Sequence, residues 1–280
     1  MYLVTGATGN VGSEVVSQLL ASGQKVRVFT RDAAKVARWS DRVEVVIGDM
    51  TQPETFAQAV SGIDGVFLMN GALDGGIFRQ LIAAVKASGN PRVVFLSSMF
   101  AGFSDYPIGQ LHKDKEDVIR ASGLHGRFVR AGSFMTNANQ WLGSIKAEGI
   151  VYNAMGTGKV APIAPDDIAA VAVRALTDPN LEPEILEVTG GELLSVPEQV
   201  AILSEGRTKP IRSVDVPIEA AVEGLIRAGV PATVAPAVGQ TFAAVREGRM
   251  AAIKDTVQQV TGKQPRSFRS WAQEHASRFA

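Results

Sequence analysis

The glycine-rich turn near the N-terminus constrains the fold of this chain more than any other feature. The apolar run Tyr2-Thr5 leads directly into Gly6-Ala7-Thr8-Gly9-Asn10-Val11-Gly12, and an amphipathic stretch follows as far as Ser22. In dinucleotide sites of this kind, the first glycine permits the tight turn, the second lets the backbone approach a pyrophosphate, and the third allows close packing of helix on strand. Free amides and the helix dipole then stabilise the phosphate charge. We therefore predict a dinucleotide site that uses Gly6, Thr8, Gly9, Asn10, Val11 and Gly12.

The rest of the first half alternates short apolar runs with amphipathic segments whose apolar residues recur three and four positions apart. This alternation is typical of β-α units that build a parallel sheet with helices on both faces. We predict an α/β protein with a Rossmann-type doubly wound parallel sheet. Strands are expected at Tyr2-Thr5, Lys25-Thr30, Val43-Ile47, Gly65-Met69, Arg92-Ser97 and Gly126-Arg130, and helices at Val11-Ser22, Pro53-Val60, Gly76-Ala87 and Leu111-Ala121.

After about Gly149 the alternation loosens, and the segments become shorter. We predict an NAD(P)-binding Rossmann domain over residues 1–149, completed by parts of 160–190, and a smaller C-terminal substrate-side lobe over residues 150–280. Asp166 and Asp167 follow a proline at an expected helix start, where they favour capping. Short strands are expected at Ile150-Tyr152, Ile185-Thr189 and Ile211-Val214, and helices at Asp166-Thr177, Val196-Ser204, Ile218-Ala228 and Thr241-Arg249.

Charge balance and residue types exclude several classes of function. The 280 residues carry 28 basic and 28 acidic side chains, so no overall field attracts nucleic acid or an anionic membrane. With no cysteine and three scattered histidines, we expect no metal site. No stretch approaches the roughly 18 to 20 apolar residues that span a bilayer, and no leader precedes the first strand, so we expect a cytoplasmic protein. The apolar stretch Val230-Val238 fits burial within one chain or between two copies, which leaves a homodimer as an alternative.

The residues after the second predicted strand indicate which dinucleotide is preferred. An acidic residue there selects the ribose 2′-hydroxyl of NAD, whereas an arginine accommodates the 2′-phosphate of NADP. The chain has Thr30-Arg31-Asp32, so Arg31 is expected on the phosphate, with hydroxyl donors from Thr30 and Thr8. If Asp32 faces the ribose instead, NAD is favoured. We predict NADP(H) in preference to NAD(H).

Later strand ends should contribute further cofactor contacts, because ligands of doubly wound sheets bind at the carboxyl edge. Asp49 is expected to accept a hydrogen bond from the adenine amino group, and the alternative is that it caps its own loop. The predicted contacts of this group are Asp49, Met50, Asn70 and Gly71.

Taken together, these motifs resemble the NmrA-like family of atypical short-chain dehydrogenases and reductases. That family includes NAD(P)H-dependent quinone and triphenylmethane-dye reductases, and also redox-sensing regulators. The likeness covers nearly the whole chain, although Ala131 stands where relatives often have proline. It rests on Thr5-Gly12, Arg31-Asp32, Gly48-Asp49, Arg130-Met135 with Asn137, and Gly262-Lys263-Gln264-Pro265.

The resemblance also indicates where the chemistry should take place. Short-chain dehydrogenases use a tyrosine as proton donor and a lysine four residues later, but these positions fall on Ile108 and His112. The family's His-x-x-x-Glu arrangement matches His112 and Glu116, which implies that Glu116 orients an imidazole contacting the nicotinamide ribose or a substrate oxygen. The alternative is a surface pair without function. Ser97, at the end of the fifth strand, and Tyr106 are further catalytic candidates.

Without the tyrosine and lysine, ordinary ketone reduction loses general acid catalysis, which contributes about 10² to 10⁴ in rate. Quinones and conjugated dyes need less help with the proton, because delocalisation stabilises their reduced products. Such acceptors need mainly flat apolar walls that hold them against the nicotinamide. The expected walls are Met99, Phe100, Phe103, Phe134, Met135 and Trp141.

These observations favour an NADPH-dependent reductase that transfers hydride to a quinone-like, dye-like or other conjugated small molecule. Two alternatives stay open: an NADP(H)-binding redox sensor that regulates a protein partner without catalysis, and a reductase or epimerase of a specific biosynthetic intermediate.

Overall fold

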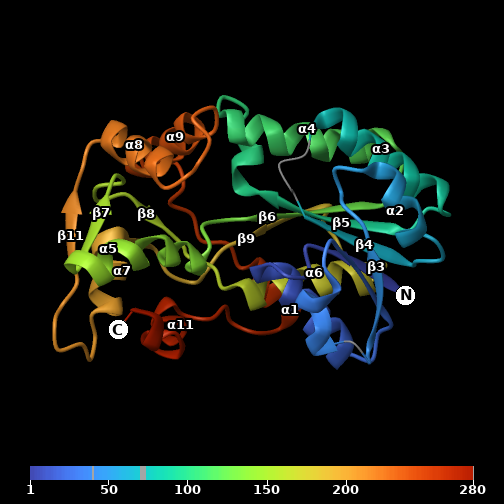
Figure 1. Cartoon of the computed structure of the whole chain (residues 1–280), viewed down its shortest axis with the longest axis horizontal. Coiled ribbons are helices and arrows are strands. Elements are labelled where there is room, and N and C mark those ends of the chain that lie inside the picture. Colours follow the sequence, from blue (N-terminus) through green and yellow to red (C-terminus); the bar gives the residue numbers. More distant parts are fainter. Residues whose placement is uncertain (40, 70–73, 280) are drawn as a thin grey trace.

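The computed structural model describes residues 1–39, 41–69 and 74–279. Its centre is a parallel sheet of seven strands in the order β3-β2-β1-β4-β5-β6-β9, which confirms the predicted Rossmann-type α/β fold (Figure 1). The strands are β1 (Tyr2–Thr5), β2 (Val26–Thr30), β3 (Val43–Ile47), β4 (Gly65–Met69), β5 (Arg92–Ser98), β6 (Gly126–Ala131) and β9 (Ile185–Val188). The strand order reverses between β1 and β4, so the carboxyl ends of these strands border the crevice where such sheets bind ligands.

Two layers of helices cover the sheet, one on each face. One layer contains α1 (Asn10–Ala21) and α6 (Pro165–Thr177), whose buried residues share a core with one side of the sheet. The opposite layer contains α2 (Pro53–Ala59), α3 (Gly75–Ala87) and α4 (Pro107–Ala121) (Figure 1). Both faces are therefore buried, which explains why the central strands are apolar throughout and do not alternate with polar residues.

Each predicted strand agrees with the structure to within one residue, whereas the two-residue strands β8 (Lys159–Val160) and β10 (Leu194–Ser195) were not predicted. Several helices begin earlier than predicted. α4 begins at Pro107 and not at Leu111, because proline is well tolerated in the first turn, where its missing amide has no partner to lose. For the same reason α9 (Ala235–Arg246) begins six residues before the predicted Thr241, with Pro236 in its first turn. Three 3₁₀ segments were not predicted: η1 (Ala33–Trp39), η2 (Met99–Gly102) and η3 (Met135–Trp141).

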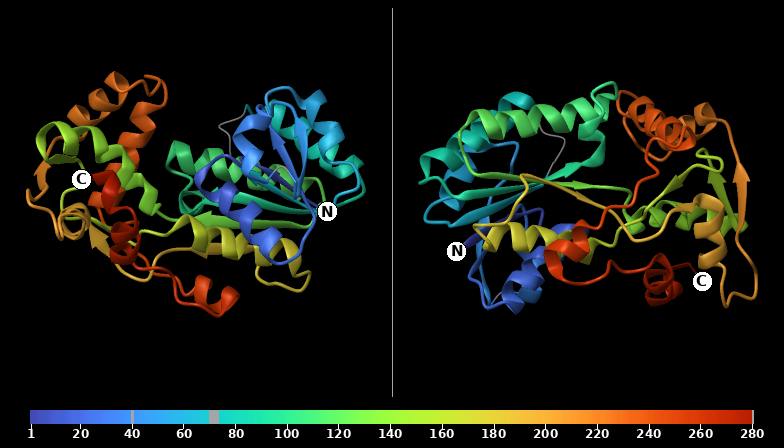
Figure 2. Two further views of the ribbon diagram at one scale, coloured as in Figure 1. Left: turned by 60° about the horizontal axis from the view of Figure 1, so that its bottom comes forward. Right: turned by 180° about the vertical axis from the view of Figure 1, so that it is seen from behind.

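A smaller lobe lies beyond the carboxyl ends of β5 and β6, at one end of the molecule (Figure 2). Its core packs η3 and α5 against the C-terminal helices around Trp141, Val200, Phe268 and Trp271. Two small sheets complete it, an antiparallel pair β10·β8 and a parallel pair β11·β7. The elements are α5 (Leu142–Glu148), β7 (Ile150–Asn153), β8 (Lys159–Val160), β10 (Leu194–Ser195), α7 (Val196–Leu203), β11 (Arg212–Asp215), α8 (Ile218–Arg227), α9, α11 (Phe268–Glu274) and α12 (Ala276–Phe279).

The chain passes back and forth between the sheet and this lobe. After β8 it returns to form α6 and then β9, which pairs with β6 from Phe128↔Ile185 to Ala131↔Val188. α10 (Thr256–Thr261) also returns, and its Val257 is buried in the core that α6 shares with the sheet. Residues far apart in the sequence therefore meet where the sheet and the lobe join. None of the helices in the described part of the chain is long and apolar enough to cross a membrane.

Candidate cofactor and substrate site

The turn between β1 and α1 has the geometry of a phosphate cradle. Gly6 adopts a φ of +65°, and the amide of Gly9 donates to the carbonyl of Gly6 at 2.9 Å. A Cβ at Gly12 would lie 2.2 Å from the Gly6 carbonyl oxygen, so only glycine lets the helix approach the turn this closely. No side chain caps α1 at Gly9, which leaves the first-turn amides for a ligand. These features fit the pyrophosphate of a dinucleotide.

Within this turn the predicted contacts differ in what their side chains do. Val11 is 4% exposed and packs into the core beside α6, so only its backbone is available to a ligand. The side-chain amide of Asn10 donates from Nδ2 to Thr136 Oγ1 at 3.3 Å and so connects the start of α1 to η3. The turn therefore touches the segment that begins the smaller lobe.

A cavity of about 270 Å³ adjoins the turn and extends along the ends of β2 and β3. It brings together the predicted cofactor contacts Gly6, Thr8, Thr30, Arg31, Asp49 and Met50. Asn70 and Gly71, also predicted, lie outside the described residues. Lys35, in η1, also lines the cavity, although the sequence analysis missed it. Its position in the segment directly after Arg31 and Asp32 was the available signal, because residues that follow the end of β2 lie at the carboxyl edge of the sheet.

The acidic residues of this cavity are held by their own loops. Asp32 Oδ1 accepts from the amide of Ala34 at 2.9 Å and so begins η1. Asp49 Oδ1 accepts from both the amide and the hydroxyl of Thr51, and these hydrogen bonds lower the pKa of Asp49. Arg31, whose side chain is 80% exposed, extends into the cavity with a guanidinium nitrogen 3.9 Å from Asp49 Oδ2. One oxygen of each carboxylate thus supports its own loop, while Arg31 lines the cavity beside the second oxygen of Asp49.

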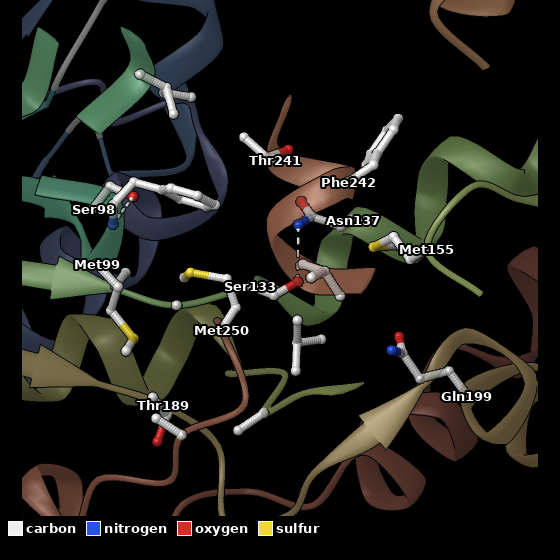
Figure 3. A pocket seen from close by; sticks show the side chains of 18 of the residues that line it. Ser98, Met99, Ser133, Asn137, Met155, Thr189, Gln199, Thr241, Phe242 and Met250 are labelled. Atoms are coloured by element: carbon white, nitrogen blue, oxygen red, sulfur yellow. Dashed lines mark hydrogen bonds between the residues drawn. The ribbon is translucent and has the colours of Figure 1, made fainter. Parts of the chain in front are cut away.

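A second cavity of about 210 Å³ lies at the carboxyl ends of β5 and β6, against the smaller lobe (Figure 3). It is the candidate site for the acceptor and is called the substrate cavity below. Of the predicted walls, Met99, Phe100 and Trp141 line it. Residues from distant segments complete it, among them Asn137, Met155, Phe242 and Met250. No local sequence signal marks the last three, because only the packing of the lobe brings them here. Among the described residues that line this cavity, none is charged.

Three predicted walls have other surroundings. Phe103 packs edge-on against Tyr106 and beneath the guanidinium of Arg249. Met135 is 1% exposed and belongs to the core of the smaller lobe. Phe134 forms a bridge to Ile163 and packs on the core of the sheet. The segment after β6 therefore lines the cavity through other residues than those predicted. They are Gly132, Ser133, Asn137 and Gln140, beside the predicted Trp141.

Ser97 and Glu116 meet in a buried network with Arg130. Ser97 Oγ donates to Glu116 Oε1 at 2.6 Å, and Arg130 donates to both carboxylate oxygens, at 2.9 and 2.6 Å. Successive strand residues face opposite sides of a sheet, so Ser97 points to α4 while Ser98 lines the substrate cavity. This geometry differs from the predicted arrangement, in which Glu116 orients His112 and Ser97 faces the ligand. Contact of either residue with a ligand would require this network to open.

The helix α4 presents an apolar residue at the position where short-chain dehydrogenases have their catalytic tyrosine. Ile108 lines the substrate cavity, whereas the ring of His112, one turn later, lies 6.3 Å from the ring of Phe95. Burial, with a smaller contribution from the charge of Lys115, lowers the pKa of His112 to about 4. The imidazole is therefore neutral at pH 7.

Tyr106 connects this region to the smaller lobe. Its side chain is only 9% exposed, and its hydroxyl accepts from Arg249 at 2.9 Å. The same guanidinium donates to Asp105 at 2.8 Å and lies over the Tyr106 ring. A hydrogen-bonded, largely buried phenol of this kind supports the wall of the cavity.

Comparison with known proteins gives matches along the whole chain. A sequence profile of the NAD(P)H-binding family matches residues 6–179. The NAD(P)H azoreductase of Xenophilus azovorans is 35% identical over 284 residues, which cover 100% of this chain and 99% of that protein. The (4-alkanoyl-5-oxo-2,5-dihydrofuran-3-yl)methyl phosphate reductase of Streptomyces griseus is 36% identical over 282 residues, with coverage of 100% and 99%.

Among solved structures, the NADPH-dependent quinone oxidoreductase of Escherichia coli in complex with NADPH has the same fold. It superposes with a TM-score of 0.87 over 98% of this chain and 99% of that chain, at 20% sequence identity. With the glycine cradle and the family match over more than half of its length, the chain belongs to the NAD(P)H-binding family, as an NmrA-like oxidoreductase of the atypical short-chain dehydrogenase type.

Proposed function

We propose that this protein is an NADPH-dependent reductase that transfers hydride to a quinone-like, dye-like or other conjugated small molecule. The observation that carries the proposal is the uncharged cavity at the ends of β5 and β6, where Ile108 lies at the position of the usual proton-donating tyrosine. A conjugated acceptor suits this cavity because apolar contacts can hold it and delocalisation stabilises its reduced form. The azoreductase and quinone reductase among the relatives support the same class of acceptor.

The residues around the substrate cavity have different roles in this reaction. A nicotinamide held here would supply the hydride. A quinone-like acceptor also needs one proton, which water can provide, whereas a cationic dye needs none. Met99 and Phe100 form apolar walls, and Asn137, whose amide donates to Ser133 Oγ at 3.4 Å, offers a neutral polar contact. For Ser97, Glu116 and Arg130 we propose a positioning role: their network holds α4, and with it Ile108, against the end of β5.

We further propose that NADPH is preferred over NADH. Arg31 and Lys35 provide two exposed cations at the end of β2, and a ribose 2′-phosphate is the group that such a pair recognises. The hydrogen bond from the Ala34 amide engages one oxygen of Asp32, the carboxylate that would otherwise favour the 2′-hydroxyl of NADH.

The decisive experiment is NADPH oxidation by the purified protein, with and without a panel of quinones and azo or triphenylmethane dyes. We expect oxidation that depends on both protein and acceptor, and faster with NADPH than with NADH. His112→Gln and Tyr106→Phe should keep most of this activity, because neither side chain needs to deliver the proton. NADPH binding without oxidation of any acceptor would contradict the proposal and favour a sensor.

Reduction of a specific biosynthetic intermediate is the second candidate, and the Streptomyces griseus relative favours it. That relative acts on a phosphate ester. No charged side chain lines the substrate cavity in the described part of this chain, so the cavity suits a neutral acceptor better than a phosphorylated one. Competition by inorganic phosphate or by phosphate monoesters for the acceptor site would reverse this order.

A further inference from the structure

A larger cavity of about 750 Å³ adjoins the substrate cavity within the smaller lobe. The two share four wall residues, Gln140, Trp141, Met155 and Phe242. Met155 and Phe242 lie close together at one side of the substrate cavity (Figure 3). The two cavities are therefore neighbours, and the flexible side chain of Met155 belongs to the wall between them, where its movement would connect them.

One wall of this larger cavity is a helix face made of small and apolar residues. α8 contributes Ala220, Ala221, Gly224 and Leu225 to it. The helix packs on α9, where a Cβ at Gly239 would meet Val222 at 2.6 Å, yet none of its described residues is fully buried. An amphipathic helix normally buries its apolar face, so α8 leaves apolar surface available to the cavity.

Some residues that line the larger cavity are exposed and polar. Tyr152, which lines it, is 47% exposed, and Arg227 lies at the end of α8 with a side chain 72% exposed. The lining of this cavity thus combines the apolar face of α8 with a few polar residues, among them Gln140 in the shared wall and the cation Arg227.

We propose that the acceptor carries an apolar chain, with its conjugated ring in the substrate cavity and the chain in the cavity beneath α8. This inference rests on the proposed reductase function and specifies its substrate class as amphiphilic conjugated acceptors. The volumes support this division, because about 210 Å³ is less than the 300 to 1,000 Å³ of typical ligand pockets, whereas the adjoining cavity adds about 750 Å³.

The first test compares quinones that share one ring and differ in the chain attached to it. We expect KM to fall at least about tenfold from the bare ring to a chain of about six carbons, since each buried methylene adds up to about fourfold in affinity. A chain of equal length that carries hydroxyl groups along its whole length should lower KM only a little. If the quinone without a chain and the quinone with the apolar chain are reduced with equal KM, the inference is wrong while the reductase function stands. If neither is reduced, both are wrong.

The second test fills the cavity. A Cβ at the helical residue Gly224 would have no neighbour closer than 3.9 Å, so Gly224→Leu can project into the cavity without disturbing the backbone. This variant should lose most of the gain from the chain and keep its KM for the bare ring. The matched control is Glu219→Leu, which adds the same side chain at an exposed position of α8 outside the cavity lining. Equal chain dependence in wild type and Gly224→Leu would show that the chain binds elsewhere or that the cavity is only an access route.

Discussion

At the scale of single residues, the choice of cofactor depends on how two adjacent side chains are held. Arg31 and Asp32 follow each other in the chain and carry opposite charges, so their order alone leaves the preference open. The structure distinguishes them through hydrogen bonding, because Asp32 accepts from the Ala34 amide at 2.9 Å while Arg31 stays 80% exposed beside Lys35 and Asp49. A carboxylate used in a helix start is less available to a ribose than a guanidinium that extends into the cavity.

Replacement of the cations should therefore separate the two cofactors. We expect Arg31→Ala to weaken NADPH binding by about 1 to 3 kcal/mol, the value of charged hydrogen bonds, with little effect on NADH. Lys35→Ala should act in the same direction. Arg42→Ala, an exposed arginine outside the cavity, is the control. Titration of nicotinamide fluorescence measures both affinities, and equal losses for NADPH and NADH would refute the assignment.

At the scale of elements, the turn between β1 and α1 uses its glycines for two different purposes. Gly12 maintains the packing of α1 on the turn, since a Cβ there would lie 2.2 Å from the Gly6 carbonyl oxygen. At Gly9 the nearest atom to such a Cβ would be the same oxygen at 3.3 Å, so an alanine needs only a small adjustment. The surface of Gly9 is thus kept clear for the ligand, whereas that of Gly12 is covered by the protein itself.

The two glycines should accordingly respond differently to alanine. Gly12→Ala should reduce the free energy of unfolding by about 1 to 3 kcal/mol, the usual cost of overpacking. Gly9→Ala should leave the melting temperature nearly unchanged and weaken NADPH and NADH alike, by at least about 1.5 kcal/mol or roughly tenfold, through one lost charged hydrogen bond. Thermal unfolding together with cofactor titration distinguishes these outcomes. Unaltered cofactor affinity in a folded Gly9→Ala protein would argue against a pyrophosphate at this turn.

At the scale of the whole molecule, two groups couple folding to pH in opposite directions. Burial lowers the pKa of His112 to about 4 from its ordinary 6.5. Asp167, whose carboxylate accepts from the Arg266 amide at 2.7 Å and so joins the C-terminal segment to α6, has its pKa raised from 3.8 to about 6, chiefly by burial. As pH falls, His112 takes up its proton at a higher pH in the unfolded chain than in the native protein. Asp167 takes up its proton at a higher pH in the native protein than in the unfolded chain. Stability is therefore lost through His112 below about pH 6.5 and gained through Asp167 below about pH 6.

Variants at these two positions should reveal the opposing effects. Relative to wild type, His112→Gln should gain about 1 to 2 kcal/mol of unfolding free energy between pH 7 and pH 4.5, because it cannot take up the proton in the unfolded state. Asp167→Asn should show the reverse trend, with its largest relative stability above pH 6, where the wild type contains an ionised buried carboxylate. Urea unfolding across this range measures both differences. Parallel pH profiles for all three proteins would contradict these linkages.

The sequence by itself determined the parts of this protein that depend on local pattern. The glycine turn, six strands of the sheet and the helices between them follow from spacing and periodicity, because residues within one turn or one strand interact with near neighbours. Thr30, Arg31 and Asp49, for which we propose cofactor contacts, line one cavity as predicted, since strand ends of a parallel sheet meet at one edge.

Only the tertiary structure decided which distant segments meet. Packing of the lobe placed Met155, Phe242 and Met250 in the substrate cavity. Ile185–Val188 lies in the range 160–190 that was expected to complete the Rossmann domain, and only the structure shows that it pairs with β6. It also directed Ser97 and Glu116 toward Arg130, because burying a carboxylate requires a cation and hydrogen bonds close by. Such contacts depend on the relative positions of whole elements, and short-range sequence pattern carries no information about those positions.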